Sequence, residues 1–190
     1  MTAFEGFLSK HGAGANCRRP SEDVISRYDG VLPDQLLTHW REAGWCSYAD
    51  GLLWVVDPDE LRAPLSEWLD EEEARGSHPI IRTALADVIY WTDRGGFYLD
   101  ARHAAIFEMT NNIELIFEYS LANDGYLDDA VGRKLSHAAI RRLGALEPDE
   151  CYGFFPALAA GGKEKAANLQ RVKLREHLSI LAQLDRPQRR

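Results

Sequence analysis

The sequence predicts an α+β protein in which a small antiparallel sheet, flanked by helices, packs against a mostly helical C-terminal half. Three observations predict this class. Short aromatic and β-branched runs, separated by turn residues, fill the first half of the chain. From Asn111 onward the apolar spacing becomes helical. With 190 residues, of which 45% are hydrophobic, the chain is long enough to bury a core.

Helices are expected at the start of the chain. One is predicted over residues 4–10, and a second begins at Ser21, whose hydroxyl suits a helix cap, and runs to about Tyr28. Pro33 fits the first turn of a third helix that ends at Gly44. This third helix has an apolar face made of Leu36, Leu37, Trp40 and Ala43.

Strands and turns follow. The turn at residues 49–51 predicts a hairpin between strands 46–48 and 52–56. Asp57-Pro58 opens a helix, and the acidic residues 70–73 with the break at 76–79 are expected to form an exposed connection. Strands over residues 85–91, 97–100 and 104–109 fit an antiparallel meander.

The second half divides from the first near residue 110. Residues 1–110 are predicted to form the mixed domain, 111–185 a helical domain and 186–190 a flexible tail. Within the second half, residues 149–162 are rich in aromatics, Gly and Pro. An apolar-striped helix is expected after them, from residue 168 to residue 184.

The charge is unevenly distributed. The net charge is −8, and residues 50–73 contain nine acids and one base, Arg62. Such a surface repels nucleic acid, because affinity for phosphates comes from Lys and Arg. It would attract a basic partner instead.

The cysteines and the start of the chain favour the cytoplasm. Cys17, Cys46 and Cys151 are odd in number and far apart, so we expect buried hydrophobes or spare thiols, with no disulfide framework and no zinc site. The N-terminus has no basic region followed by a long apolar core, and no run is long enough to span a membrane. We therefore expect no membrane association.

Motifs for catalysis are weak. Gly12-Ala13-Gly14-Ala15-Asn16 and Gly161-Gly162-Lys163 lack the context of a phosphate-binding loop, and the six histidines never pair at metal-ligand spacing. An enzyme could use one constellation, His177 with Glu176 and Asp149; a buried structural histidine is the simpler interpretation. We expect no enzyme activity, no metal and no cofactor.

Two stretches carry a family resemblance. The pattern Leu32-Pro-Asp-Gln-Leu-Leu-x-x-Trp40-x-x-x-Gly44, followed by residues 50–58 and 83–91, resembles the GAD-like domain. Residues 149–162, with 168–173 and 176–184, resemble the C-terminal domain that accompanies it. This arrangement is similar to type VI secretion system immunity proteins that neutralise a cognate DNase toxin. The resemblance implies a cytoplasmic, non-catalytic protein whose partner is a nuclease, and it supplies no catalytic residues.

An acidic surface would serve such a protein, because carboxylates can take the place of DNA phosphates on a nuclease. The expected partner-binding residues are Asp57, Asp59, Glu60, Glu67, Asp70, Glu71, Glu72 and Glu73. A merely solvated helix face is the competing interpretation of these acids. The alternative function is a ligand-sensing or regulatory module without a toxin partner, with residues 151–162 as a pocket wall.

Overall fold

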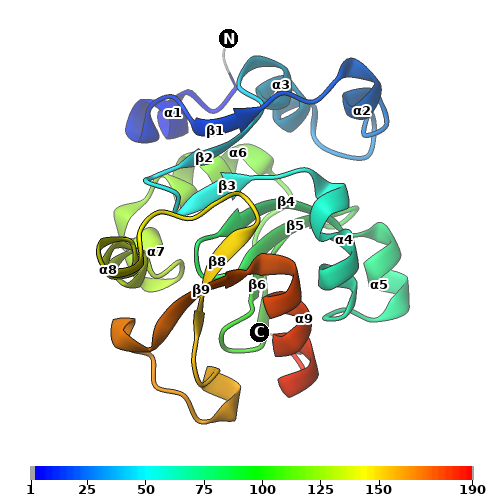
Figure 1. Cartoon of the computed structure of the whole chain (residues 1–190). Helices are drawn as coiled ribbons and strands as arrows, with labels where there is room; N and C mark the ends of the chain where they lie inside the picture. The colour runs from blue at the N-terminus through cyan, green and yellow to red at the C-terminus, as the bar shows by residue number, and fades with distance from the viewer. Residues whose placement is uncertain (1–2, 190) are drawn as a thin grey trace.

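The centre of the molecule is one large sheet (Figure 1). A computed structural model describes residues 3–189. Eight strands run in the order β1-β2-β3-β4-β5-β6-β7-β10, and successive neighbours are antiparallel except β10, which lies parallel to β7. The strands are β1 (Ala15–Arg18), β2 (Trp45–Tyr48), β3 (Leu53–Val55), β4 (His78–Thr83), β5 (Val88–Thr92), β6 (Gly95–Asp100), β7 (Ala105–Glu108) and β10 (Gln188–Arg189).

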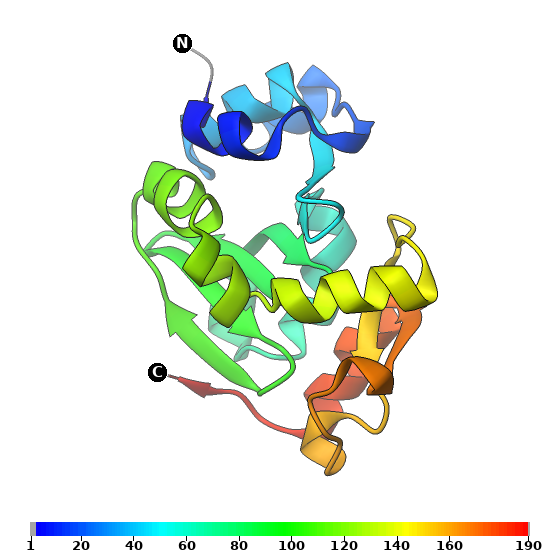
Figure 2. The same cartoon turned by 90° about the vertical axis from the view of Figure 1, so that its left-hand side faces the viewer.

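Helices cover both sides of this sheet. Three of them lie at the top of Figure 1 around β1: α1 (Glu5–His11), α2 (Glu22–Ser26) and α3 (Asp34–Glu42). On the right of that view lie α4 (Pro58–Ser66), α5 (Glu71–Gly76) and α9 (Leu174–Leu184). The other side, which faces the viewer in Figure 2, carries α6 (Ile113–Leu115), the π-helix η1 (Ile116–Leu121), α7 (Asp124–Asp129) and α8 (Arg133–Leu143).

A separate two-stranded ribbon completes the C-terminal half. It pairs β8 (Glu150–Phe154) with β9 (Leu169–Lys173), and the short 3₁₀ helices η2 (Leu158–Ala160) and η3 (Ala166–Asn168) lie in the loop between them. The ribbon is joined to the central sheet because the amide of Tyr152 donates to the carbonyl of Ala84 at 2.8 Å. One hydrophobic core therefore spans both halves.

The predicted α+β class is confirmed, but the sheet is larger than expected. Residues 78 and 79, expected in an exposed connection, begin the buried central strand β4, and Pro79 lies where the pairing with β5 shifts register. The acidic residues before it form α5 rather than a loop. The sequence pattern does not predict β4 because the segment begins with a histidine and a proline, and proline is normally excluded from a central strand.

The C-terminal helix was predicted six residues too long. Residues 169–173 form β9, and α9 begins only at Leu174. The alternation in β9 is hidden because only Leu169 is buried and the strand runs directly into the helix. The last residues, expected to be a flexible tail, instead include the strand β10, because Gln188 and Arg189 pair with Ala105 and Ile106 of β7.

Candidate functional site

The predicted acidic surface lies on α4 and α5, and the three carboxylates at its α4 end are engaged within the protein. Asp57 caps α4, because its Oδ1 accepts a hydrogen bond from the amide of Asp59 at 3.0 Å. Asp59 forms an ion pair with Arg62 at 3.3 Å. Glu60 pairs with Arg18 at 2.5 Å. The charge at this end of the surface is therefore partly compensated by the protein's own arginines.

Glu73 is the least available of the predicted residues, because its side chain is only 9% exposed. One of its oxygens accepts a hydrogen bond from the Tyr90 hydroxyl at 3.2 Å and lies 3.6 Å from Arg94. Arg189 pairs with the other oxygen. Glu73 thus fastens α5 to β5, to the following turn and to the C-terminal strand, and it is a structural residue.

Four predicted carboxylates remain exposed where α4 leads into α5: Glu67, Asp70, Glu71 and Glu72. Asp70 caps α5 through the amide of Glu73, and Glu71 lies 3.5 Å from Arg75 on the open surface. Glu67 accepts a hydrogen bond from Ser179 of α9 at 2.6 Å. Within residues 3–189, Glu72 has no ion-pair partner. These four residues, called the α4–α5 carboxylates below, are what is left of the predicted surface.

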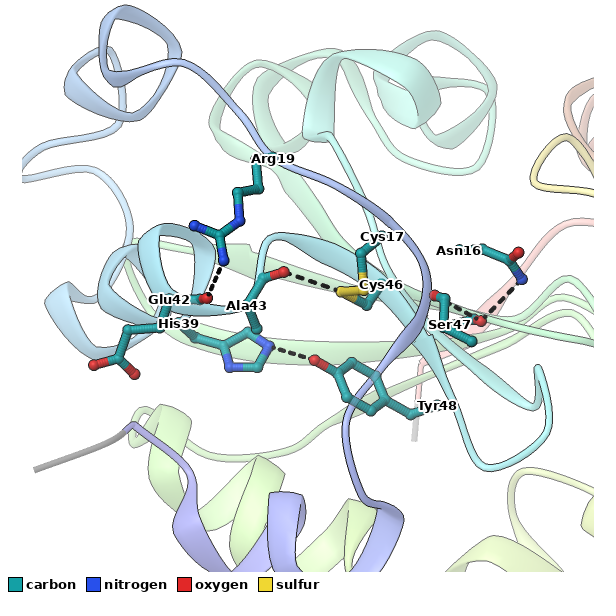
Figure 3. Close-up of a disulfide and its surroundings, with 10 residues drawn as sticks. Asn16, Cys17, Arg19, His39, Glu42, Ala43, Cys46, Ser47 and Tyr48 are labelled. Atoms are coloured by element: carbon teal, nitrogen blue, oxygen red, sulfur yellow. Dashed lines mark hydrogen bonds between the residues drawn. A yellow bond between two sulfur atoms is a disulfide. The ribbon is translucent and has the colours of Figure 1, made fainter.

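The prediction for the cysteines is wrong for two of the three. Cys17 of β1 and Cys46 of β2 form a disulfide, with their Cα atoms 4.1 Å apart (Figure 3). The sequence separation of 29 carries no disulfide signature, and the pairing arises because β1 folds back antiparallel to β2. Cys151 is buried as expected, and burial raises the pKa of its thiol to about 12.

Next to the disulfide, His39 is a core histidine (Figure 3). Its Nε2 lies 3.1 Å from the hydroxyl of Tyr48, and its ring packs against Phe4 and Phe117. Burial lowers the pKa of His39 to about 4, so the imidazole is neutral near pH 7. Its contacts link α1, α3 and η1 in the core.

The residues of the possible enzyme site do not converge on a reactive arrangement. The His177 ring packs on Gly153 and stacks with Phe155 at 6.2 Å between centroids, and burial lowers its pKa to about 4. Asp149 instead forms an ion pair with Lys173 at 2.6 Å. Glu176 is exposed on α9. His177 is therefore a neutral packing residue, which agrees with the simpler of the two sequence interpretations.

Residues 151–162 join the two halves instead of lining a ligand pocket. Besides the Tyr152–Ala84 hydrogen bond, the buried guanidinium of Arg82 donates to the carbonyl of Pro148, just before this segment, at 3.1 Å. The cavity beside Gly153 and Phe154 has a volume of only about 10 Å³, which is too small for an organic ligand. The turns in this segment therefore serve packing.

A cleft with a volume of about 670 Å³ was not among the sites predicted from the sequence. Its walls come from β6, β7 and the loop between them, from α6, η1 and α7, and from Glu164. Leu115 and Tyr119 line it and are 41% and 71% exposed. A signal was present, because both are large apolar residues outside the predicted apolar face of this helical segment.

A buried polar network lies beneath this cleft. The Asp87 carboxylate accepts hydrogen bonds from the Tyr98 hydroxyl at 2.8 Å and the Ala101 amide at 3.1 Å, and it pairs with Arg102 at 3.0 Å. Arg102 also donates to the carbonyl of Ala130 at 2.7 Å. Burial by itself would lower the pKa of Arg102, but the Asp87 carboxylate raises it above the ordinary value. The charge of Arg102 is therefore satisfied internally.

No metal-binding cluster or membrane helix was found in the described part of the chain. Among residues 3–189, no group of three or more His, Cys, Asp or Glu side chains is placed to hold a metal ion. None of the helices in the same range combines the length and the apolar character needed to cross a bilayer.

Comparison with known proteins gives the family. Residues 2–103 match the model of the GAD-like domain, and residues 110–185 match the model described as T6SS immunity protein Tdi1, C-terminal. The crystal structure of Atu4351 from Agrobacterium tumefaciens is similar, with a TM-score of 0.77 and 18% sequence identity over 95% of this chain and 88% of that one. At this identity the likeness shows the fold. The comparison with curated proteins finds no match.

The two family matches follow each other along the chain in the order that the sequence motifs predict, and the resemblance is confirmed. The chain belongs to the GAD-like domain family and carries the C-terminal domain of type VI secretion system immunity proteins of the Tdi1 family.

Proposed function

We propose that the protein binds and neutralises a cognate nuclease toxin delivered by a type VI secretion system, and that it does so in the cytoplasm without catalysis or a cofactor. The match of residues 110–185 to an immunity-protein domain carries this proposal. The net charge of −8 supports a basic partner, such as an enzyme that binds DNA, and disfavours direct binding to nucleic acid.

The proposed contact surface includes the α4–α5 carboxylates. Glu67 and Asp70 cap the facing ends of α4 and α5, and Glu71 and Glu72 lie in α5. All four are exposed and are held in place before a partner arrives. Carboxylates on a rigid face can occupy the positions that DNA phosphates take on a nuclease. They would raise the association rate more than the final affinity, because exposed charges act mainly through steering. A stable inhibitory complex also needs roughly 1,200–2,000 Å² of buried surface, more than these residues provide.

Non-catalytic action agrees with the geometry of the best catalytic candidates. His177 packs against Gly153 and Phe155, and Asp149 is paired with Lys173. The three residues considered as a catalytic set, His177, Glu176 and Asp149, therefore do not form one site. Inhibition by binding requires only a preformed surface, which is consistent with the single core that spans both halves.

The proposal is tested with the product of the neighbouring gene. That protein is expressed with and without this chain, and growth, DNA cleavage and direct binding are measured. We expect growth arrest and DNA cleavage without the chain, and rescue with a one-to-one complex in its presence. A toxic neighbour that cuts DNA but neither binds this chain nor is inhibited by it would contradict the proposal.

The contact surface is tested by the variant Glu71→Lys/Glu72→Lys. We expect a lower association rate and a weaker dependence of that rate on salt. Asp23→Lys/Asp34→Lys is a matched control, because these acids are also exposed in the first turns of helices, α2 and α3. Equal association rates for both variants would remove the α4–α5 carboxylates from the interface.

A further inference from the structure

The large cleft lies where the two family-matched regions meet. The GAD-like region contributes Tyr98 and Arg102 to its wall, and Phe107 follows shortly after that region. The C-terminal domain contributes Tyr119 and Tyr126. Junctions of this kind are common places for binding sites. The volume of about 670 Å³ exceeds that of one side chain and falls within the range of sites that enclose a ligand.

Aromatic and apolar side chains form much of its wall: Phe107, Met109, Leu115, Tyr119 and Tyr126. Tyr119 is the most exposed large hydrophobic residue described, at 71%, and Leu115, four residues before it in the lining, is also exposed. A tyrosine presented in this way beside a concave apolar wall is typical of an anchor for a protein partner. The π-helix η1, which carries Tyr119, is a rare element that often occurs at functional sites.

Carboxylates surround these aromatic residues. Glu108, Asp129 and Glu164 all line the cleft and are exposed. Within residues 3–189, neither Glu108 nor Asp129 has an ion-pair partner. Glu164 contacts Arg102 and His103 only at 3.4 and 3.7 Å.

The two basic residues of the cleft do not offset these acids. Arg102 is paired with Asp87, and His103 is paired with Asp100 at 2.9 Å. The hydrogen bond with Asp100 also raises the pKa of His103. The lining of the cleft carries four carboxylates, Asp100, Glu108, Asp129 and Glu164, against Arg102 and His103, so the cleft keeps a net negative charge.

We infer that this cleft receives a basic segment of the toxin, in which an Arg or Lys side chain enters between the aromatic wall and the carboxylates. The inference rests on the proposed function and names a second contact surface for the same partner. A guanidinium suits this environment because it can stack on an aromatic face while it pairs with a carboxylate at its edge. A nucleic acid is excluded as occupant, because the carboxylates would repel its phosphates.

The cleft and the α4–α5 carboxylates lie on opposite faces of the sheet. Neighbouring residues of β6 show this: Phe97 stacks on Tyr90, whose hydroxyl reaches Glu73 of α5, whereas Tyr98 contacts Tyr126 of α7. The two views agree, with α4 and α5 on one side and α7 on the other (Figures 1 and 2). Variants of one surface therefore leave the other intact.

The affinity of the purified neighbouring-gene toxin is measured for the wild type, for Tyr119→Ala and for Glu108→Gln/Asp129→Asn. We expect Tyr119→Ala to weaken the equilibrium affinity by at least about tenfold, since truncating an anchor of an interface has effects of this size. The charge variant is expected to lose affinity and to show less dependence on salt. All these side chains are exposed, so circular dichroism and the thermal midpoint should remain those of the wild type.

A photo-crosslinking residue at position 119 then identifies the occupant, with the same residue at the exposed position of Val31 as a control. We expect position 119 to crosslink to a toxin segment that contains Arg or Lys, and position 31 to give no crosslink. Unchanged affinity of the cleft variants, or a crosslink to a segment without basic residues, overturns the inference while immunity stands. If the wild type does not bind or inhibit the toxin at all, the proposed function fails and the inference fails with it.

Discussion

Replacing Cys17 by Ser should lower the free energy of unfolding by about 3.6 kcal/mol. In the chain-entropy treatment, the gain from a disulfide depends on the length of the closed loop, and the sequence separation of 29 between Cys17 and Cys46 gives this value at 25 °C. Cys17 is exposed, so the change to Ser removes no buried contact. The loss therefore measures the covalent link itself.

Apart from the disulfide, β1 is held by its pairing with β2 and by contacts of exposed side chains. All four of its residues are exposed. The Ser47 hydroxyl of β2 donates to the Ala15 carbonyl at 3.0 Å and accepts a hydrogen bond from the side-chain amide of Asn16 at 3.3 Å. At roughly 2–4 °C per kcal/mol for a chain of this size, the thermal midpoint should fall by about 7–14 °C.

Urea unfolding of the wild type and the variant, each with and without a reducing agent, measures this effect. We expect the wild type with reducing agent to have the same free energy of unfolding as Cys17→Ser without it. The free energy of unfolding of the variant should not change when the reducing agent is added. Thiol titration of the unfolded oxidised wild type should find one free cysteine, Cys151, and three after reduction. A wild type whose unfolding free energy changes by less than about 1 kcal/mol on reduction would refute the reasoning.

The remaining predictions concern buried polar and glycine positions. Asp87→Asn should cost about 3–5 kcal/mol, because it removes the nearest and most buried charge partner of Arg102. Urea unfolding that shows a loss below about 1 kcal/mol would contradict this role. His39 and His177 have folded-state pKa values of about 4, below the ordinary 6.5, so the unfolded state binds protons first as the pH falls. The free energy of unfolding should therefore be at its maximum above pH 6.5 and should fall by roughly 3 kcal/mol per histidine towards pH 4, at about 1.4 kcal/mol per pKa unit. A free energy of unfolding that does not change over this pH range would exclude the effect. Gly153→Ala places a Cβ 2.5 Å from the His177 ring, so about 1–3 kcal/mol should be lost, and an unchanged urea midpoint would show that the ring moves freely.

Local sequence signals predicted most of the helices and the meander correctly. Asp57-Pro58 does begin α4, and the apolar face of the third helix is buried as Leu36, Leu37 and Trp40. These features depend on caps and on spacing within one element, which the sequence displays directly. The large missed strand, β4, is central only because β3 and β5 pair with it, and that information is not local.

The candidate site was harder to predict, because the charge of a residue does not reveal its partners. Glu73 looks like its neighbours Glu71 and Glu72, yet Tyr90 and Arg94 bind it once β5 and the turn after it lie beside α5. The cleft is assembled from residues 98–130 together with Glu164, so no single motif describes it. The Cys17–Cys46 disulfide likewise follows from strand pairing and not from spacing.

The disulfide also bears on the proposed cytoplasmic location. Thiols in that compartment are kept reduced in most bacteria, so a protein that acts there should carry Cys17 and Cys46 as thiols in the cell. Alkylation of intact cells before lysis reports the state directly. A fully oxidised pair under these conditions would contradict the cytoplasmic proposal.

The most direct test of the account is titration of the purified neighbouring-gene toxin with this protein while DNA cleavage and heat of binding are recorded together. The account predicts a one-to-one complex and loss of cleavage at the same molar ratio, with weaker binding for Tyr119→Ala. Cleavage that continues at saturating concentrations of this protein, without detectable binding, would contradict the claim that it neutralises a nuclease by association.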